Sequence, residues 1–345
     1  MTALQSLRAT NFWSLRPVTR MDLAVGAFED ISSAQVPGVP ESLRAALPGL
    51  YEHRCSIGER GGFLSRLRRG TYAPHIIEHV ALELQTMAGH DVGYGRTRGG
   101  DVPGEYTVIV EHMHTGVGLR AAALALEIVQ RAFGGTLDSV EHAVAELRAL
   151  TDTPDVSAVY QHVLCGITGG GPRRETRSEM VRLGLPASAL IVDVAPSYVL
   201  QAGLPYSRSE IAVILDAEPA DVPPRYQDPE RARRLVGVLC DAVWRNGIAV
   251  IPAKEWEVQD YAREQGCRVA VFATDDDVTS RDTKVARAVG LVSSGRILLE
   301  GFDATEDGGT LRADTPATAQ VAAALALYSL RELRSEGAPA NVSIP

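Results

Sequence analysis

The chain has 345 residues, of which 45% are hydrophobic and 22% charged, so it can bury enough core for two domains. Its formal net charge of −9 argues against a general nucleic-acid or anionic-membrane binder, since both need a basic surface. No apolar run approaches the roughly 20 residues that span a bilayer, and residues 1–20 lack the pattern of a signal peptide. We therefore expect a soluble cytoplasmic protein without a nucleic-acid or membrane partner.

Residues 21–150 carry the mixed periodicities of an α+β unit. The strongest helix candidate within them is 73–89, because Pro74 suits a first helical turn and Gly89 suits a helix stop. In chain order the pattern predicts a strand, a helix, a polar loop, this helix, a strand and two further helices, over residues 21–25, 40–51, 52–63, 73–89, 104–114, 118–133 and 137–150.

The second half alternates short apolar runs with helical or turn segments, and a long helix over 315–337 closes it. Continuous apolar runs of this length are typical of a parallel sheet that is buried on both faces. The stretch 151–157 has the composition of a linker. The sequence therefore predicts an α/β protein with an N-terminal α+β domain, a parallel-sheet α/β domain and a tail, over residues 1–155, 156–335 and 336–345.

His75, Glu78 and His79 form the pattern H-x-x-E-H inside the predicted helix 73–89. Histidines four residues apart project side by side from one helix face and can share one tetrahedral Zn²⁺. Glu78 lies near enough to be the catalytic base for a zinc-bound water, whose pKa the metal lowers toward ~7. The pattern predicts one Zn²⁺ per chain and zinc-dependent hydrolysis. The alternative is a surface helix whose two histidines are satisfied by ordinary hydrogen bonds.

A zinc hydrolase needs a third protein ligand. Glu111 is our favoured candidate, because a carboxylate completing a two-histidine site is a common hydrolase set. Arg96 and Arg98 can clamp a substrate carboxylate bidentately, or they are solvated loop charges. The other candidate ligands are His53, Cys55, Glu59, His112 and His114, and the remaining residues that we expect to contact substrate are His53, Arg54, Cys55 and Arg60.

Three blocks, LRATNFWSLR, EHRCSIGERGGFLSRLRRGTYAPHIIEHVALELQTMAGHDVGYGRTR and GEYTVIVE, resemble the N-terminal domain of cyanophycin synthetases over roughly residues 3–150. In some members of that family, this domain is credited with a metallopeptidase-like activity that cuts the β-aspartyl-arginine polymer and generates primers. The matching residues His75, Glu78 and His79 are intact here. The resemblance thus implies the same zinc-hydrolase activity for the N-terminal domain.

The second half resembles the Mur-ligase portion of the same synthetases in degenerate form, without the ATP-grasp domain between the two. GITGGGPRRET stands where that family has a G-T-G-K-T-T-type phosphate loop, which needs a lysine and a hydroxyl residue. Arg173 and Arg174 occupy those two places, and Pro172 replaces a glycine. The resemblance implies a domain retained as a scaffold that does not use ATP, although the glycine turn 169–171 can still hold a phosphate or carboxylate.

Three functions remain, in this order of preference. The first is zinc-dependent hydrolysis of an amide or isopeptide bond in a small-molecule or short-peptide substrate such as a cyanophycin-like peptide. The second is a non-catalytic binding or assembly subunit that partners a ligase, and the third is a residual ATP-dependent amide ligase. We expect a homodimer, because symmetric dimers are the commonest soluble assembly.

Overall fold

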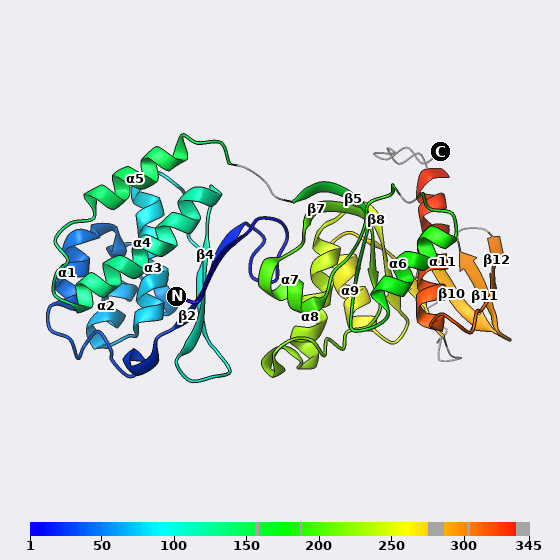
Figure 1. Ribbon diagram of the computed structural model, residues 1–345, viewed down its shortest axis with the longest axis horizontal. Helices are drawn as coiled ribbons and strands as arrows, with labels where there is room; N and C mark the ends of the chain where they lie inside the picture. The colour runs from blue at the N-terminus through cyan, green and yellow to red at the C-terminus, as the bar shows by residue number, and fades with distance from the viewer. Residues whose placement is uncertain (156–158, 187, 275–285, 302–303, 336–345) are drawn as a thin grey trace. The chain divides into compact units, whose positions relative to one another are not determined.

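The computed structural model describes residues 1–155, 159–186, 188–274, 286–301 and 304–335 (Figure 1). It divides the chain into two compact units. The first comprises Met1–Arg8 and Trp13–Ala158, and the second comprises Ala9–Phe12 and Val159–Pro345. The sequence patterns placed a boundary at 155/156 and did not anticipate that a short N-terminal segment joins the second unit. The predicted tail, 336–345, lies outside the described residues.

The N-terminal unit contains an antiparallel four-stranded sheet in the order β1-β2-β4-β3. Helices α3 and α4 pack against this sheet and against each other. Pro48 ends the predicted helix 40–51 early, and a 3-10 helix follows. The elements are β1 (Ala3–Leu7), β2 (Val18–Ala24), α1 (Val39–Ala46), α2 (Gly62–Arg69), α3 (Ala73–Met87), β3 (Gly95–Gly99), β4 (Glu105–Glu111), α4 (Thr115–Phe133) and α5 (Glu141–Thr151), with 3-10 helices at Gly26–Phe28, Pro48–Tyr51 and Cys55–Ile57.

Helix α3 lies at the centre of this unit, and 11 of its 15 residues are buried. Apolar side chains such as Ile76, Val80 and Leu84 pack into the core. A helix that is buried on nearly every side also buries its polar residues, and buried polar groups need hydrogen-bond partners. The polar residues of α3 are therefore the place where a functional site can be expected.

The second unit is built on an eight-stranded sheet in the order β12-β11-β10-β9-β8-β7-β5-β6. Pairing is parallel from β10 to β6, while β10, β11 and β12 pair antiparallel. The predicted parallel-sheet α/β class is confirmed. The elements are β5 (Tyr160–Thr168), α6 (Arg173–Arg182), β6 (Ile191–Asp193), α7 (Pro196–Ala202), β7 (Tyr206–Ile214), a 3-10 helix (Pro224–Tyr226), α8 (Pro229–Asp241), β8 (Val243–Pro252), α9 (Trp256–Glu264), β9 (Arg268–Phe272), β10 (Ala288–Ser293), β11 (Arg296–Gly301), β12 (Ala304–Thr310) and α11 (Ala317–Ser335).

Helix α11 is apolar along most of its length and packs against β7 to β12 and against α6. Its run of alanines, including Ala322 and Ala323, allows close approach to the sheet. Among the described residues, no helix is long and apolar enough to cross a membrane.

Candidate functional site

A cavity of about 810 Å³ opens beside α3 in the N-terminal unit. Four chain segments form its wall: one face of α3, the stretch from Gly49 to Ser56, Arg66 of α2, and the approach to β3 together with its first residues. Its charged and titratable lining residues are Glu52, His53, Arg54, Cys55, Arg66, His75, Glu78, His79, Glu83 and Arg96.

Helical spacing explains why α3 contributes several of these side chains. His75, His79 and Glu83 follow one another at intervals of four, and Glu78 is three residues after His75, so all four share one face. The imidazole rings of His75 and His79 lie with centroids 4.9 Å apart, and Phe63 stacks on His79 at 3.9 Å. The predicted convergence of the two histidines and Glu78 is therefore present in the fold.

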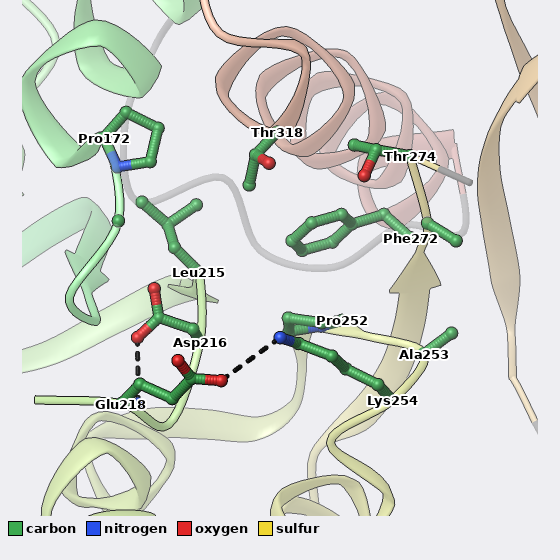
Figure 2. A pocket seen from close by; sticks show the side chains of 12 residues that line it. Pro172, Leu215, Asp216, Glu218, Pro252, Ala253, Lys254, Phe272, Thr274 and Thr318 are labelled. Carbon is green, nitrogen blue, oxygen red and sulfur yellow. Dashed lines mark hydrogen bonds and ion pairs between the residues drawn. The ribbon is translucent and has the colours of Figure 1, made fainter. Parts of the chain in front are cut away.

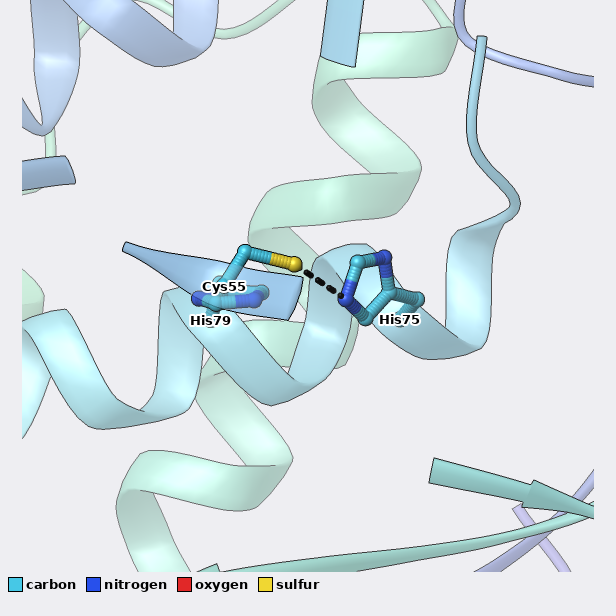
Figure 3. A group of neighbouring side chains, drawn as sticks. All are labelled: Cys55, His75 and His79. Carbon is cyan, nitrogen blue, oxygen red and sulfur yellow. Dashed lines mark hydrogen bonds between the residues drawn. The ribbon is translucent and has the colours of Figure 1, made fainter. Parts of the chain in front are cut away.

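Cys55 completes a set of three potential metal donors with these histidines (Figure 3). The ligand atoms of Cys55, His75 and His79 all lie within 4.8 Å of one another, and Cys55 Sγ is 3.4 Å from His75 Nε2. Cys55 has a φ of 53°, in the left-handed region that non-glycine residues rarely adopt. Thiolate sulfur and imidazole nitrogen are the donors that Zn²⁺ prefers, so this chemistry fits the predicted ion.

Glu111, the predicted third ligand, points elsewhere. It ends β4, and its Oε2 accepts hydrogen bonds from the N–H groups of Gly93 (3.1 Å) and Tyr94 (3.2 Å). The Nε atom of Arg16 lies 3.3 Å from Glu111 Oε1. The carboxylate therefore holds the loop before β3 and does not line the cavity. Cys55 stands beside the histidines because the chain turns back over α3 at the 3-10 helix Cys55–Ile57.

Glu78 is a buried carboxyl group in the wall of the cavity. Burial raises its pKa to about 7, although the hydrogen bond from Thr97 Oγ1 to Oε2 (2.6 Å) partly opposes that shift. Gly95 gives this side chain room, because a Cβ there would lie 2.7 Å from Glu78 Cγ. Glu78 therefore changes charge near neutral pH, which suits a group that exchanges a proton or binds a cation.

A second buried carboxylate, Glu83, begins a chain of hydrogen bonds across the cavity wall. Its Oε2 is 3.2 Å from His53 Nε2, and His53 Nδ1 is 2.9 Å from His79 Nδ1. Burial holds the pKa of His79 well below its usual value, so this ring is neutral. A neutral His53 that donates to Glu83 must accept from His79, and His79 then presents a bare lone pair at Nε2. That buried Nε2 has no hydrogen-bond partner among the described residues.

The ring of His75 is oriented by a hydrogen bond with Thr71. Thr71 Oγ1 lies 2.9 Å from its Nδ1, which leaves Nε2 facing Cys55. Burial lowers the pKa of His75 to about 4, and the nearby Arg66 charge acts in the same direction. Two neutral imidazoles therefore offer unprotonated nitrogens, as metal ligands or as acceptors of substrate hydrogen bonds.

The predicted substrate-binding residues divide into two groups. His53, Arg54, Cys55 and Arg96 line the cavity, whereas Arg60 and Arg98 do not. Arg60 instead forms an exposed two-pronged ion pair with Glu52. The lining residues that the sequence analysis did not single out include Glu52, Arg66, Glu83 and Thr97. Only Glu83 carried a usable signal, since it follows His79 by four residues on the same helix face.

The second unit has its own cavity, of about 280 Å³, at the carboxyl ends of β5, β7, β8 and β9 (Figure 2). Its glycine loop is occupied by protein groups. Gly170 donates its N–H to Asp216 Oδ1 at 2.7 Å, and Arg173 bonds to Gly169 O. In Figure 2, Asp216 and Glu218 lie together on one wall, with Lys254 reaching Glu218. A phosphate cradle needs free N–H groups and no adjacent carboxylate, so this loop is poorly suited to nucleotide phosphate.

Residues 20–133 match the family described as cyanophycin synthase-like N-terminal domain. The chain is 41% identical over 161 residues to the cyanophycin synthetase of Synechocystis sp., which covers 44% of this chain and 17% of that protein. It is 46% identical over 167 residues to the cyanophycin synthetase of Trichormus variabilis, and the match covers 47% of this chain and 18% of that protein. The chain thus spans less than a fifth of the length of these relatives.

Among solved structures, the chain is similar to the MurF ligase of Thermotoga maritima in complex with ADP, with a TM-score of 0.37 and 14% identity over 51% of this chain and 46% of that chain. A murein peptide ligase from Psychrobacter arcticus has a TM-score of 0.33 and 9% identity, and the match covers 50% of this chain and 44% of that chain. Likenesses this weak do not bear on function.

The prediction of a zinc-dependent metallohydrolase with peptidase-like activity is wrong. The proteins that match the N-terminal unit at 40–46% identity are named synthetases, which points to ligase-type chemistry. The motif analysis erred because H-x-x-E-H specifies a cluster of donors on a helix and leaves the reaction at that cluster open. The donor set of Cys55, His75 and His79 fits Zn²⁺ whichever reaction the unit serves.

Proposed function

We propose, on the premise that the N-terminal unit is a cyanophycin synthase-like N-terminal domain, that this chain serves ligase-type chemistry on an amino-acid polymer. In this proposal the cavity beside α3 holds the end of the polymer, or a short peptide precursor, for a partner ligase that activates the carboxyl group with ATP and forms the new amide bond. The observation that carries the proposal is the combination of this domain's identity to synthetases with the balanced charge of its cavity.

The lining offers both signs of charge. Glu78 and Glu83 supply carboxyl groups beside Glu52, which pairs with Arg60, while Arg54, Arg66 and Arg96 supply guanidinium groups. No described carboxylate forms an ion pair with any of these three arginines. A ligand that carries both a guanidinium and a carboxylate, as a β-aspartyl-arginine unit does, finds a complementary partner for each group.

The volume is consistent with such a ligand. Sites for small molecules commonly enclose about 300–1,000 Å³, and this cavity falls within that range. The neutral rings of His75 and His79 add acceptors that orient amide N–H groups, and Thr97 holds Glu78 in place. The role that we assign to these residues is binding and orientation of substrate.

Binding of a synthetic β-aspartyl-arginine peptide, measured by titration calorimetry, tests the proposal. We expect Arg66→Gln and Glu83→Gln each to weaken binding about tenfold, since each removes one charge-assisted partner. Arg98→Gln and Glu59→Gln are the matched controls, because both residues are exposed and lie outside the cavity lining. We expect the controls to bind within about twofold of the parent protein.

The fate of the peptide gives the second readout. After incubation with the chain, Mg-ATP and free amino acids, mass spectrometry should find the peptide unchanged, because we expect this chain not to use ATP by itself. A shortened peptide would mean that the chain hydrolyses it. That result, or no peptide binding up to millimolar concentration, would contradict the proposed function.

A further inference from the structure

A second hollow in the N-terminal unit, of about 350 Å³, is lined by three arginines and by no carboxylate. Arg44 comes from α1, and Arg68 and Arg69 come from α2. Helix α2 thus divides its arginines, since Arg66 lines the cavity beside α3 and the other two line this hollow. The two cavities are separate features of the unit.

The charge of the hollow is uncompensated. In the part of the chain that the structure describes, none of the three guanidinium groups of Arg44, Arg68 and Arg69 forms an ion pair. Like charges gathered around one hollow repel each other, and the chain as a whole is acidic at −9. The last-turn positions of all three residues offset part of that repulsion, because helix carboxyl ends favour cations.

The neutral lining adds further donors. Tyr51, Leu64 and Ser65 also line the hollow, and two of these residues carry hydroxyl groups. Tyr51 is half exposed, with 53% of its surface open to solvent. A concave site with three guanidiniums, two hydroxyls and no carboxylate is complementary to oxyanions, which guanidinium groups bind bidentately.

We propose that this hollow binds a small polyanion that carries two or more phosphate or carboxylate groups. The size is suitable, because 350 Å³ is at the lower end of the range for small-molecule sites. A ligand with two oxyanion groups can engage guanidiniums from both helices at once, since Arg44 is on α1 and the other two are on α2. The proposal does not depend on the function proposed for the cavity beside α3.

Calorimetric titration of the full chain at low ionic strength tests the site, with inorganic pyrophosphate as one probe and a tri-aspartate peptide as the other. We expect at least one probe to bind, and the probe that binds identifies phosphate or carboxylate as the preferred group. Arg68→Gln and Arg69→Gln should each weaken that binding roughly tenfold. Arg68→Lys should have an intermediate effect, because it keeps the charge and loses the two-pronged geometry.

Arg98→Gln is the control for net charge, as it removes one exposed arginine of the same unit from outside the hollow. It should change the affinity less than twofold. An equal loss of probe affinity in Arg98→Gln would show that the probe is held by diffuse electrostatic attraction and not by the hollow. Equal affinity in the parent protein and both Arg68 variants would show that the probe does not bind in the hollow. Either result, or no binding of either probe below about 1 mM, overturns the proposal. Circular dichroism spectra and unfolding temperatures equal to those of the parent protein would show that Arg68→Gln and Arg69→Gln fold.

Discussion

Glu78 makes the N-terminal unit sensitive to pH through a single buried carboxyl group. Burial raises its pKa from the ordinary 4.5 to about 7, so the folded state favours the protonated, neutral form. As the pH rises from 4.5 through 7, the unfolded state loses this proton first, and the free energy of unfolding falls. Above pH 7 the folded chain bears the cost of a buried charge.

We therefore expect Glu78→Gln to raise the unfolding temperature of metal-free protein at pH 8, because the amide is uncharged and still accepts the hydrogen bond from Thr97. The gain should shrink as the pH is lowered from 7 to 4.5. Thermal unfolding followed by circular dichroism at several pH values checks this, with exposed Glu59→Gln as the control. A gain that is the same at pH 5 and pH 8 would contradict the assignment of the shift to Glu78.

Metal binding at Cys55, His75 and His79 remains a prediction of one Zn²⁺ per chain. The orphaned Nε2 of buried His79 and the nearby thiol give it a structural basis. Elemental analysis of protein purified without added zinc should find about one equivalent. Cys55→Ser and His79→Gln should each reduce this strongly, and Glu111→Gln should leave it unchanged, since Glu111 faces the loop before β3. Loss of zinc in Glu111→Gln alone would restore the original ligand prediction.

At the scale of elements, the site depends on glycines in the segments that face α3. Gly49 lies against Glu83, where a Cβ would be 2.0 Å from Oε1, and Gly95 lies similarly close to Glu78. These two positions allow the 3-10 segment and β3 to approach the face of α3 that carries the buried carboxyl groups Glu78 and Glu83. A strand at 95–99 was not predicted, because its short glycine-flanked sequence reads as a loop.

Gly95→Ala should destabilise the N-terminal unit by about 1–3 kcal/mol, since the new methyl group overlaps the Glu78 side chain. Gly93→Ala is the matched control, because nothing lies within 4 Å of a Cβ there, and it should cost under about 0.5 kcal/mol. Urea unfolding of both variants gives the comparison. Adding Glu78→Ala to Gly95→Ala should recover part of the loss; failure to do so would place the strain elsewhere.

At the scale of the whole molecule, ATP binding depends on the glycine loop of the second unit. The expectation that the chain does not use ATP remains a prediction, supported by the occupied glycine loop of the second unit. Calorimetry with Mg-ATP should therefore detect no binding. If ATP does bind, Asp216→Ala should strengthen it, because that change frees the N–H of Gly170 and removes a carboxylate from the phosphate position. The homodimer also remains a prediction, which light scattering can check against the chain mass of 36.9 kDa.

The sequence by itself determined the features that depend on local periodicity. Helical spacing fixed His75, Glu78 and His79 on one face of α3, and apolar runs fixed the parallel sheet of the second unit. The blocks that resemble cyanophycin synthetases located the N-terminal domain, which the match over 20–133 confirms. These features follow from intervals of a few residues, which a sequence displays directly.

Only the tertiary structure decided which distant residues join that helix face. Cys55 reaches the histidines from 20 residues upstream along the chain, and Glu111 turns away to bind backbone N–H groups. The gathering of Arg44 with Arg68 and Arg69 likewise depends on how α1 packs against α2. Such contacts arise from chain reversals and burial, in which many candidate partners of equal chemistry compete, and periodicity does not distinguish among them.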